Sequence, residues 1–211
     1  MPLQNRVMPD GEIVISPERG MLMGNRGGRL HDPETRTLVR TQSSRQWIIC
    51  VLQFKSRQRQ VMGKGYTELF FMDEVTALAA GPRPCCECRR KDALSFRAAW
   101  QASHALAAPP SAPDMDRVLS SERRAKGGTK ITWTARAGTL PSGAMVRVDN
   151  DILAVRDRKL LPWTAAGYRA GIPLDLNLVV EVLTPPTIAR ILHAGYQPIW
   201  HPSIEHAGDK I

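Results

Sequence analysis

The stretch that decides the fold is residues 70–88, FFMDEVTALAAGPRPCCEC. Asp73 stands where a helix N-cap is expected, and an Ala-rich run leads from it to Gly81, a residue typical of the position just after a helix. Cys85 and Cys88 follow with the Cys-x-x-Cys spacing that turns two thiolates toward one metal ion. The stretch therefore predicts the end of a strand, a short helix and a zinc knuckle.

The same residues resemble the second half of the zinc domain of the Ada methylphosphotriester repair proteins. A paired aromatic strand, an Ala-rich helix and Ala-Gly-x-Arg-Pro-Cys-x-x-Cys follow one another in the same order and spacing over residues 70–88. The resemblance implies a zinc knuckle on a DNA-associated module. In that family a zinc-bound cysteine accepts a methyl group from DNA, so DNA repair is among the functions implied.

Members of that family supply two further zinc ligands upstream of the knuckle. Only one cysteine, Cys50, lies upstream here, on a predicted strand face where a plainly buried cysteine is the alternative. His31 is the predicted fourth ligand, with Cys86 or a distant histidine such as His201 as alternatives. The predicted zinc ligands are thus Cys50, Cys85, Cys88 and His31.

The charge balance favours a polyanionic partner. The chain of 211 residues carries a net charge of +9, with an isoelectric point near 9.9. Residues 1–108 hold 16 Lys and Arg against 10 Asp and Glu, a net +6. We expect nucleic acid, DNA rather than RNA, to bind this half. The predicted contact residues are Lys55, Arg57 and Arg59 on one strand face, and Arg89, Arg90 and Lys91 after the knuckle.

The pattern of apolar residues predicts an α+β protein with two parts. Residues 1–108 form a zinc-knuckle domain: loops around a strand at 12–15, strands at 47–62 and 66–71, and helices at 74–80 and 89–104. Three prolines in 106–115 predict a linker. Residues 116–211 form a small antiparallel β domain, with a helix at 116–124, strands at 130–134, 144–148, 152–156, 160–163 and 177–183, and a C-terminal helix up to 194.

Several classes of protein are excluded or disfavoured. No run of 18 apolar residues occurs, so we expect no membrane span, and the lack of an apolar leader favours the cytoplasm. Three of the four cysteines cluster, which favours metal over a disulfide framework. No Walker, Gly-x-Ser-x-Gly or dinucleotide motif occurs. The leading hypothesis is a zinc-binding, nucleic-acid-associated protein. The alternatives are a nuclease or repair enzyme anchored by the knuckle, and a protein–protein module that uses zinc to fold.

Overall fold

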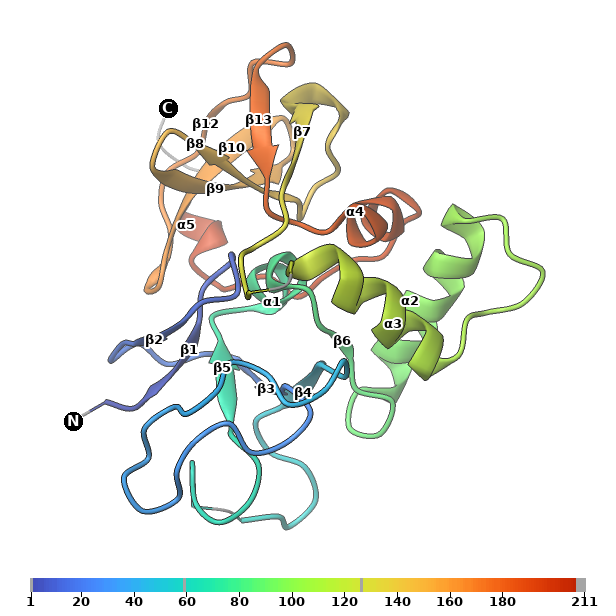
Figure 1. Cartoon of the computed structure of the whole chain (residues 1–211). Helices are drawn as coiled ribbons and strands as arrows, with labels where there is room; N and C mark the ends of the chain where they lie inside the picture. The colour runs from blue at the N-terminus through green and yellow to red at the C-terminus, as the bar shows by residue number, and fades with distance from the viewer. Residues whose placement is uncertain (1, 59, 126, 208–211) are drawn as a thin grey trace.

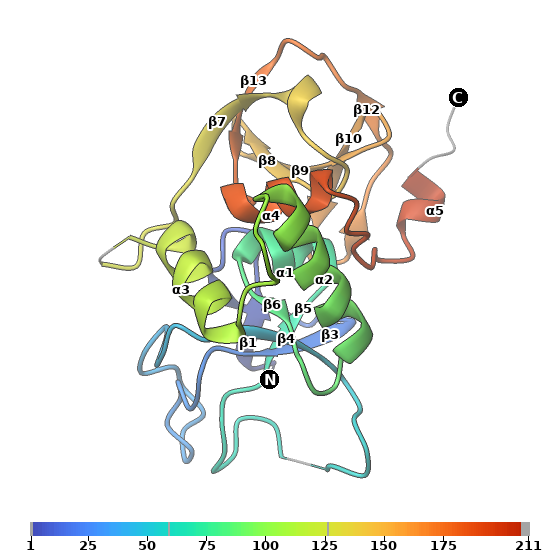
Figure 2. The same ribbon diagram turned by 90° about the vertical axis from the view of Figure 1, so that its right-hand side faces the viewer.

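The structure, a computed structural model, describes residues 2–58, 60–125 and 127–207 and is α+β, as predicted. A six-stranded mixed sheet and a seven-stranded antiparallel sheet lie at opposite ends of the molecule, with helices between and beside them (Figures 1 and 2). Two loops rich in polar residues extend from the first sheet, away from the second (Figure 2).

The first sheet has the strand order β2-β1-β5-β3-β4-β6. Its strands are β1 (Gln4–Val7), β2 (Ile13–Ile15), β3 (Leu22–Asn25), β4 (Ile48–Val51), β5 (Leu69–Phe71) and β6 (Arg83–Pro84). The strands predicted at 12–15 and 66–71 are present, whereas β1 and β3 lie in a segment expected to be loop. The strand predicted over 47–62 ends at Val51, and Lys55 has a left-handed backbone (φ 55°) that a continuing strand does not allow.

The helices next to the knuckle follow the sequence closely. Helix α1 (Glu74–Ala80) is capped by Asp73, whose carboxylate accepts a hydrogen bond from the Thr76 N–H at 2.8 Å. It ends at Gly81 with φ 108°, a conformation that glycine adopts without strain. Helix α2 (Arg90–Ser103) follows the knuckle as predicted.

Helix α3 (Ala112–Arg123) begins inside the predicted linker, which is a correction. Ser111 caps it, and Pro113 occupies its first turn, where the missing N–H of a proline costs nothing. The prolines therefore start this helix instead of preventing it.

The second sheet has the order β11-β10-β9-β8-β13-β7, with β12 also paired to β10. Its strands are β7 (Trp133–Arg136), β8 (Met145–Val148), β9 (Asp151–Arg156), β10 (Lys159–Thr164), β11 (Gly167–Tyr168), β12 (Ile172–Pro173) and β13 (Val179–Val182). A 3-10 turn (Ala137–Thr139) follows β7, and helices α4 (Pro186–His193) and α5 (Ile204–Ala207) complete the chain. All five predicted strands and the C-terminal helix are present within a few residues.

The buried core does not follow the division predicted between 1–108 and 116–211. One cluster joins Phe96 and Trp100 of α2 to Ile188 and Ile191 of α4. A second joins residues of α1 to the second sheet, with Val75 at the contact. The two-domain division stays a prediction about folding units, while the packing joins both parts.

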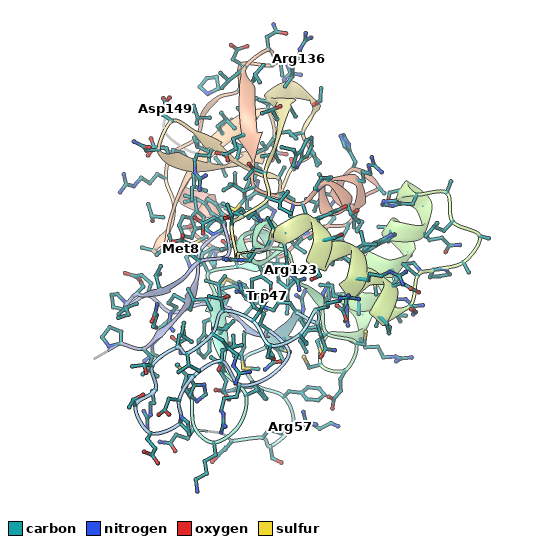
Figure 3. All side chains as sticks on the ribbon, in the orientation of Figure 1. Met8, Trp47, Arg57, Arg123, Arg136 and Asp149 are labelled. Atoms are coloured by element: carbon teal, nitrogen blue, oxygen red, sulfur yellow. The ribbon has the colours of Figure 1, made fainter. Side chains whose placement is uncertain are left out.

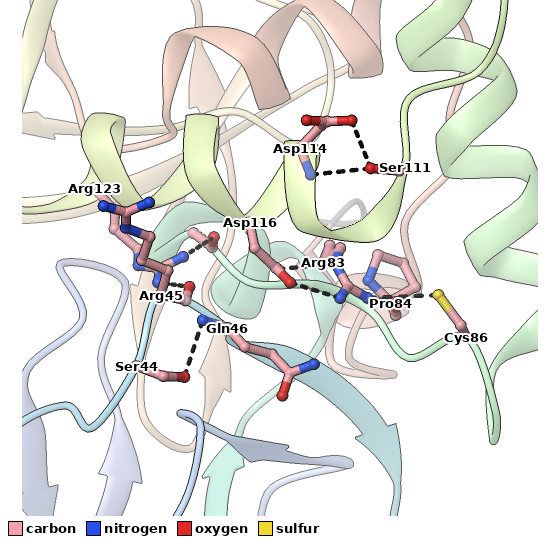
Figure 4. Close-up of polar contacts among 11 residues, drawn as sticks. Ser44, Arg45, Gln46, Arg83, Pro84, Cys86, Ser111, Asp114, Asp116 and Arg123 are labelled. Atoms are coloured by element: carbon pink, nitrogen blue, oxygen red, sulfur yellow. Dashed lines mark hydrogen bonds and ion pairs between the residues drawn. The ribbon is translucent and has the colours of Figure 1, made fainter.

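Two buried ion pairs bracket the knuckle. Before it, the Arg83 guanidinium donates two hydrogen bonds, at 2.9 and 2.8 Å, to the carboxylate of Asp116 on α3 (Figure 4). After it, Arg89 donates to Glu74 of α1 at 2.8 Å, and both side chains of this pair are almost fully buried. The ends of the knuckle are thereby fixed to two different helices.

Of the carboxylates in these two ion pairs, that of Glu74 has partners in more segments of the chain. Besides Arg89, it accepts hydrogen bonds from the Tyr196 hydroxyl at 2.7 Å and the Ile199 N–H at 3.0 Å. These contacts tie the knuckle, α1 and the C-terminal segment together.

We predict that Glu74→Gln lowers the free energy of unfolding by about 3 kcal/mol, because the buried Arg89 guanidinium then keeps only Asp92, a partly exposed carboxylate 2.8 Å away, as a charged partner. Urea denaturation followed by circular dichroism measures this. The matched control is Asp157→Asn, the same chemical change in an ion pair whose carboxylate is exposed, where we expect about 0.5 kcal/mol or less. Equal effects for the two variants would contradict a structural role for the Glu74–Arg89 pair.

Candidate metal centre

Parallel pairing of β4 with β6 brings the three cysteines together. Ile49 lies opposite Pro84, and the N–H of Cys85 donates to the Ile49 carbonyl at 2.9 Å. Cys50 follows Ile49 and Cys85 follows Pro84, so the two cysteine side chains point to the same face of the sheet. The knuckle turn then returns Cys88 to them, with the Arg89 N–H bonded to the Cys85 carbonyl at 3.2 Å.

The geometry of this group suits a metal ion. The Sγ atoms of Cys50, Cys85 and Cys88 all lie within 4.8 Å of one another, and none of these cysteines is in a disulfide. A tetrahedral zinc ion with Zn–S bonds of about 2.3 Å needs sulfurs about 3.8 Å apart, which small side-chain rotations achieve. Three clustered thiols can therefore hold a metal ion such as zinc.

Hydrogen bonds within the cluster separate the pKa values of its thiols. Hydrogen bonds from the thiols of Cys50 and Cys88 lower the pKa of Cys85, and the backbone N–H groups of Cys88 and Glu87 add to the effect. The Glu87 N–H lies 3.4 Å from this sulfur. The hydrogen bond to Cys85 raises the pKa of Cys50, and burial raises it further. A bound cation would displace the remaining thiol protons.

His31 is not part of this group, which corrects the predicted ligand set. Its imidazole is buried, with Nδ1 2.6 Å from the Thr67 hydroxyl and Nε2 2.8 Å from the Gly63 carbonyl. Both ring nitrogens are thus occupied in organising a loop. Neither alternative joins the cluster: Cys86 is exposed and lies 3.6 Å from the Arg83 guanidinium (Figure 4), and His201 bonds to Ser203.

The three cysteines line a cleft of about 1090 Å³ on the open face of the first sheet. Four residues in register cross this face from strand to strand. Arg6 pairs with Phe70, Phe70 with Met23, and Met23 with Cys50. With strands about 4.8 Å apart, the backbone positions of this cross-strand row span about 15 Å, from Arg6 on β1 to Cys50 on β4.

Three arginines and three aromatic rings contribute to the remaining wall of the cleft, together with a larger number of aliphatic and amide side chains. Arg6, Arg19 and Arg57 line it, and the Arg6 guanidinium lies 5.0 Å from the centre of the Phe70 ring. The other aromatic lining residues are Phe54 and Tyr66. Two carboxylates, those of Glu68 and Glu87, also reach it.

The residues predicted to bind nucleic acid separate into groups. Arg57 lines the cleft and donates to Glu87 at 2.9 Å, and Lys55 lies 3.7 Å from the same carboxylate. Arg89 is buried in its ion pair with Glu74 and has no surface to offer, which corrects that assignment. Two other candidates, Arg90 and Lys91, are exposed at the start of α2 outside the cleft lining; Arg59 lies outside the described residues.

The sequence did not identify Arg6, Arg19 or Phe70 as site residues. Arg6 and Arg19 belong to a segment expected to be loop. Arg6 lies on β1, a strand of only four residues that is identified by its pairing with β2 and β5, and Arg19 lies outside the strands. One signal was available. Adjacent strand residues point to opposite faces, so one ring of the Phe70-Phe71 pair had to lie on the face away from the core.

No protein-family model, curated protein or solved structure matches this chain. The resemblance of residues 70–88 to the Ada zinc domain therefore has no support from a family match, and the three-cysteine cluster stands on its own geometry. Among the described residues, no helix is long and apolar enough to cross a membrane.

We predict that the reduced protein binds about one zinc ion per chain, and that Cys50→Ser, Cys85→Ser and Cys88→Ser each remove most of it, because each variant would take away one of three sulfur donors. Elemental analysis after dialysis against a weak chelator measures this. Cys86→Ser is the control in the same turn and keeps the metal. Loss of zinc in Cys86→Ser but not in Cys50→Ser would contradict the ligand set.

Proposed function

We propose that this protein binds zinc through Cys50, Cys85 and Cys88 and binds nucleic acid in the cleft beside the metal. The observation that carries the proposal is the cross-strand row Arg6–Phe70–Met23–Cys50, in which a cation, an aromatic ring and one cysteine of the cluster share one surface. Guanidinium groups pair with phosphates, and aromatic rings stack on bases.

The dimensions and lining of the cleft favour unpaired nucleotides over a duplex. A cavity of about 1090 Å³ matches the upper end of the size range of pockets that bind small molecules, and it accommodates a short single strand. The half-buried rings of Phe54, Tyr66 and Phe70 suit base stacking, which requires bases that are not enclosed in a helix. Lys55 and Arg57 both pair with exposed Glu87, and a phosphate can replace this weakly bound carboxylate.

A second candidate is an enzyme acting on the bound strand. It is favoured by the position of the three cysteines in the wall of the cleft, where a metal ion would lie beside the ligand. Incubation of zinc-loaded protein with end-labelled single-stranded DNA and RNA tests it, since a new product band or a change in mass identifies a reaction. Recovery of the oligonucleotide unchanged would contradict the enzyme function and would leave nucleic-acid binding as the only proposed activity.

We predict that single-stranded DNA binds with a strong salt dependence, and that Arg57→Ala and Arg19→Ala each reduce the slope of log affinity against log salt by about 0.7, one phosphate contact apiece. Fluorescence anisotropy at several salt concentrations measures the slopes. The matched control is Arg136→Ala, an exposed arginine on β7 at the opposite end of the molecule (Figure 3), which should leave the slope unchanged. Equal losses at Arg57 and Arg136 would indicate non-specific attraction to net charge.

We predict that Phe54→Ala weakens binding of a single-stranded oligonucleotide by about 1–2 kcal/mol, because it removes a stacking surface. Phe54→Tyr keeps an aromatic ring and should retain most of the affinity. A duplex of the same length should bind more weakly than the single strand and respond little to Phe54→Ala. Tighter binding of the duplex would contradict the preference for unpaired bases.

A further inference from the structure

We propose that the metal ion held by Cys50, Cys85 and Cys88 has an open fourth coordination position that faces the cleft. A water molecule occupies it in the free protein, and a donor atom from an external ligand replaces that water. This inference rests on the metal-binding part of the proposed function. It adds that the metal is in direct contact with what the cleft binds.

The first argument is the donor set. Among the histidine, cysteine, aspartate and glutamate side chains of the described residues, no fourth member joins the three-cysteine group. The nearest carboxylate in sequence, Glu87, is not in the group and forms ion pairs with Arg57 at 2.9 Å and Lys55 at 3.7 Å. Zinc in proteins is normally four-coordinate, so a three-ligand site takes its fourth donor from solvent or from a ligand.

The second argument is the direction in which the site opens. Behind the cysteines lies the protein interior, where Ile49 of β4 is completely buried and Arg83 of β6 is engaged with Asp116. In front of them lies the cleft, which Cys50, Cys85 and Cys88 all line. A solvent-derived donor therefore has access from the cleft side.

The third argument is the chemistry of such a site. Structural zinc sites are closed by four protein ligands, whereas sites that act on ligands keep one position open. Zinc held by three cysteines activates water in some nucleobase deaminases. Three thiolates leave the zinc complex with a net charge of −1, and the arginines that line the cleft offset this for an anionic donor.

The test replaces zinc by cobalt(II), whose spectrum reports its ligands. Full-length apoprotein loaded with one equivalent of cobalt should show a thiolate-to-cobalt charge-transfer band and the d–d bands of a four-coordinate site. Titration with azide, and separately with imidazole, should then shift the d–d bands in a saturable way while the charge-transfer band persists. Arg57→Ala should weaken azide binding about fivefold, equivalent to about 1 kcal/mol, and leave imidazole binding unchanged.

The outcomes are distinguishable. A charge-transfer band with d–d bands that neither probe alters would show a closed site and overturn the inference, while the metal-binding function would stand. Absence of any charge-transfer band would overturn both. Cys86→Ser serves as the control: an altered resting d–d spectrum in this variant would identify Cys86 as the fourth ligand and overturn the inference as well.

Discussion

The structure depends on two buried ion pairs that hold the ends of the Cys-x-x-Cys turn. Arg83 is fixed to Asp116 of α3, and Arg89 is fixed to Glu74 of α1. Buried charges are costly without their partners, so each pair restrains the backbone beside it. The position of the turn between them therefore depends on α1 and α3.

The alternation of the strands then decides what faces the metal. On β5, Leu69 and Phe71 are buried against the helices, so Phe70 must point to the other face. The same alternation on β4 buries Ile49 and turns Cys50 outward to the cleft. Because the register aligns Phe70, Met23 and Cys50 across three strands, the aromatic ring and the three-cysteine cluster lie on one face of the sheet with Met23 between them.

Two of the cations at the cleft are paired with one carboxylate of the protein. Glu87, inside the knuckle, binds Arg57 and Lys55 from the loop after β4, and these exposed ion pairs contribute little to stability. Their effect is to hold the cationic loop over the cysteines while leaving it able to exchange one anion for another. An anionic ligand would thus meet Arg57 and Lys55, whose present partner is weakly held, close to the three cysteines.

The sequence by itself determined the helix caps at Asp73 and Gly81, the knuckle, α2, and most of the second sheet, because these are set by local backbone preferences and short-range periodicity. It also placed Cys50 on one face of a strand. Only the tertiary structure decided that Cys50 meets Cys85, that His31 is engaged elsewhere, that Arg89 is a buried structural partner, and that Arg6 reaches the cleft. Each of these depends on pairing between segments distant in the chain. Short strands such as β1 and β6 acquire their conformation from their neighbours, so their own residues carry little signal of it.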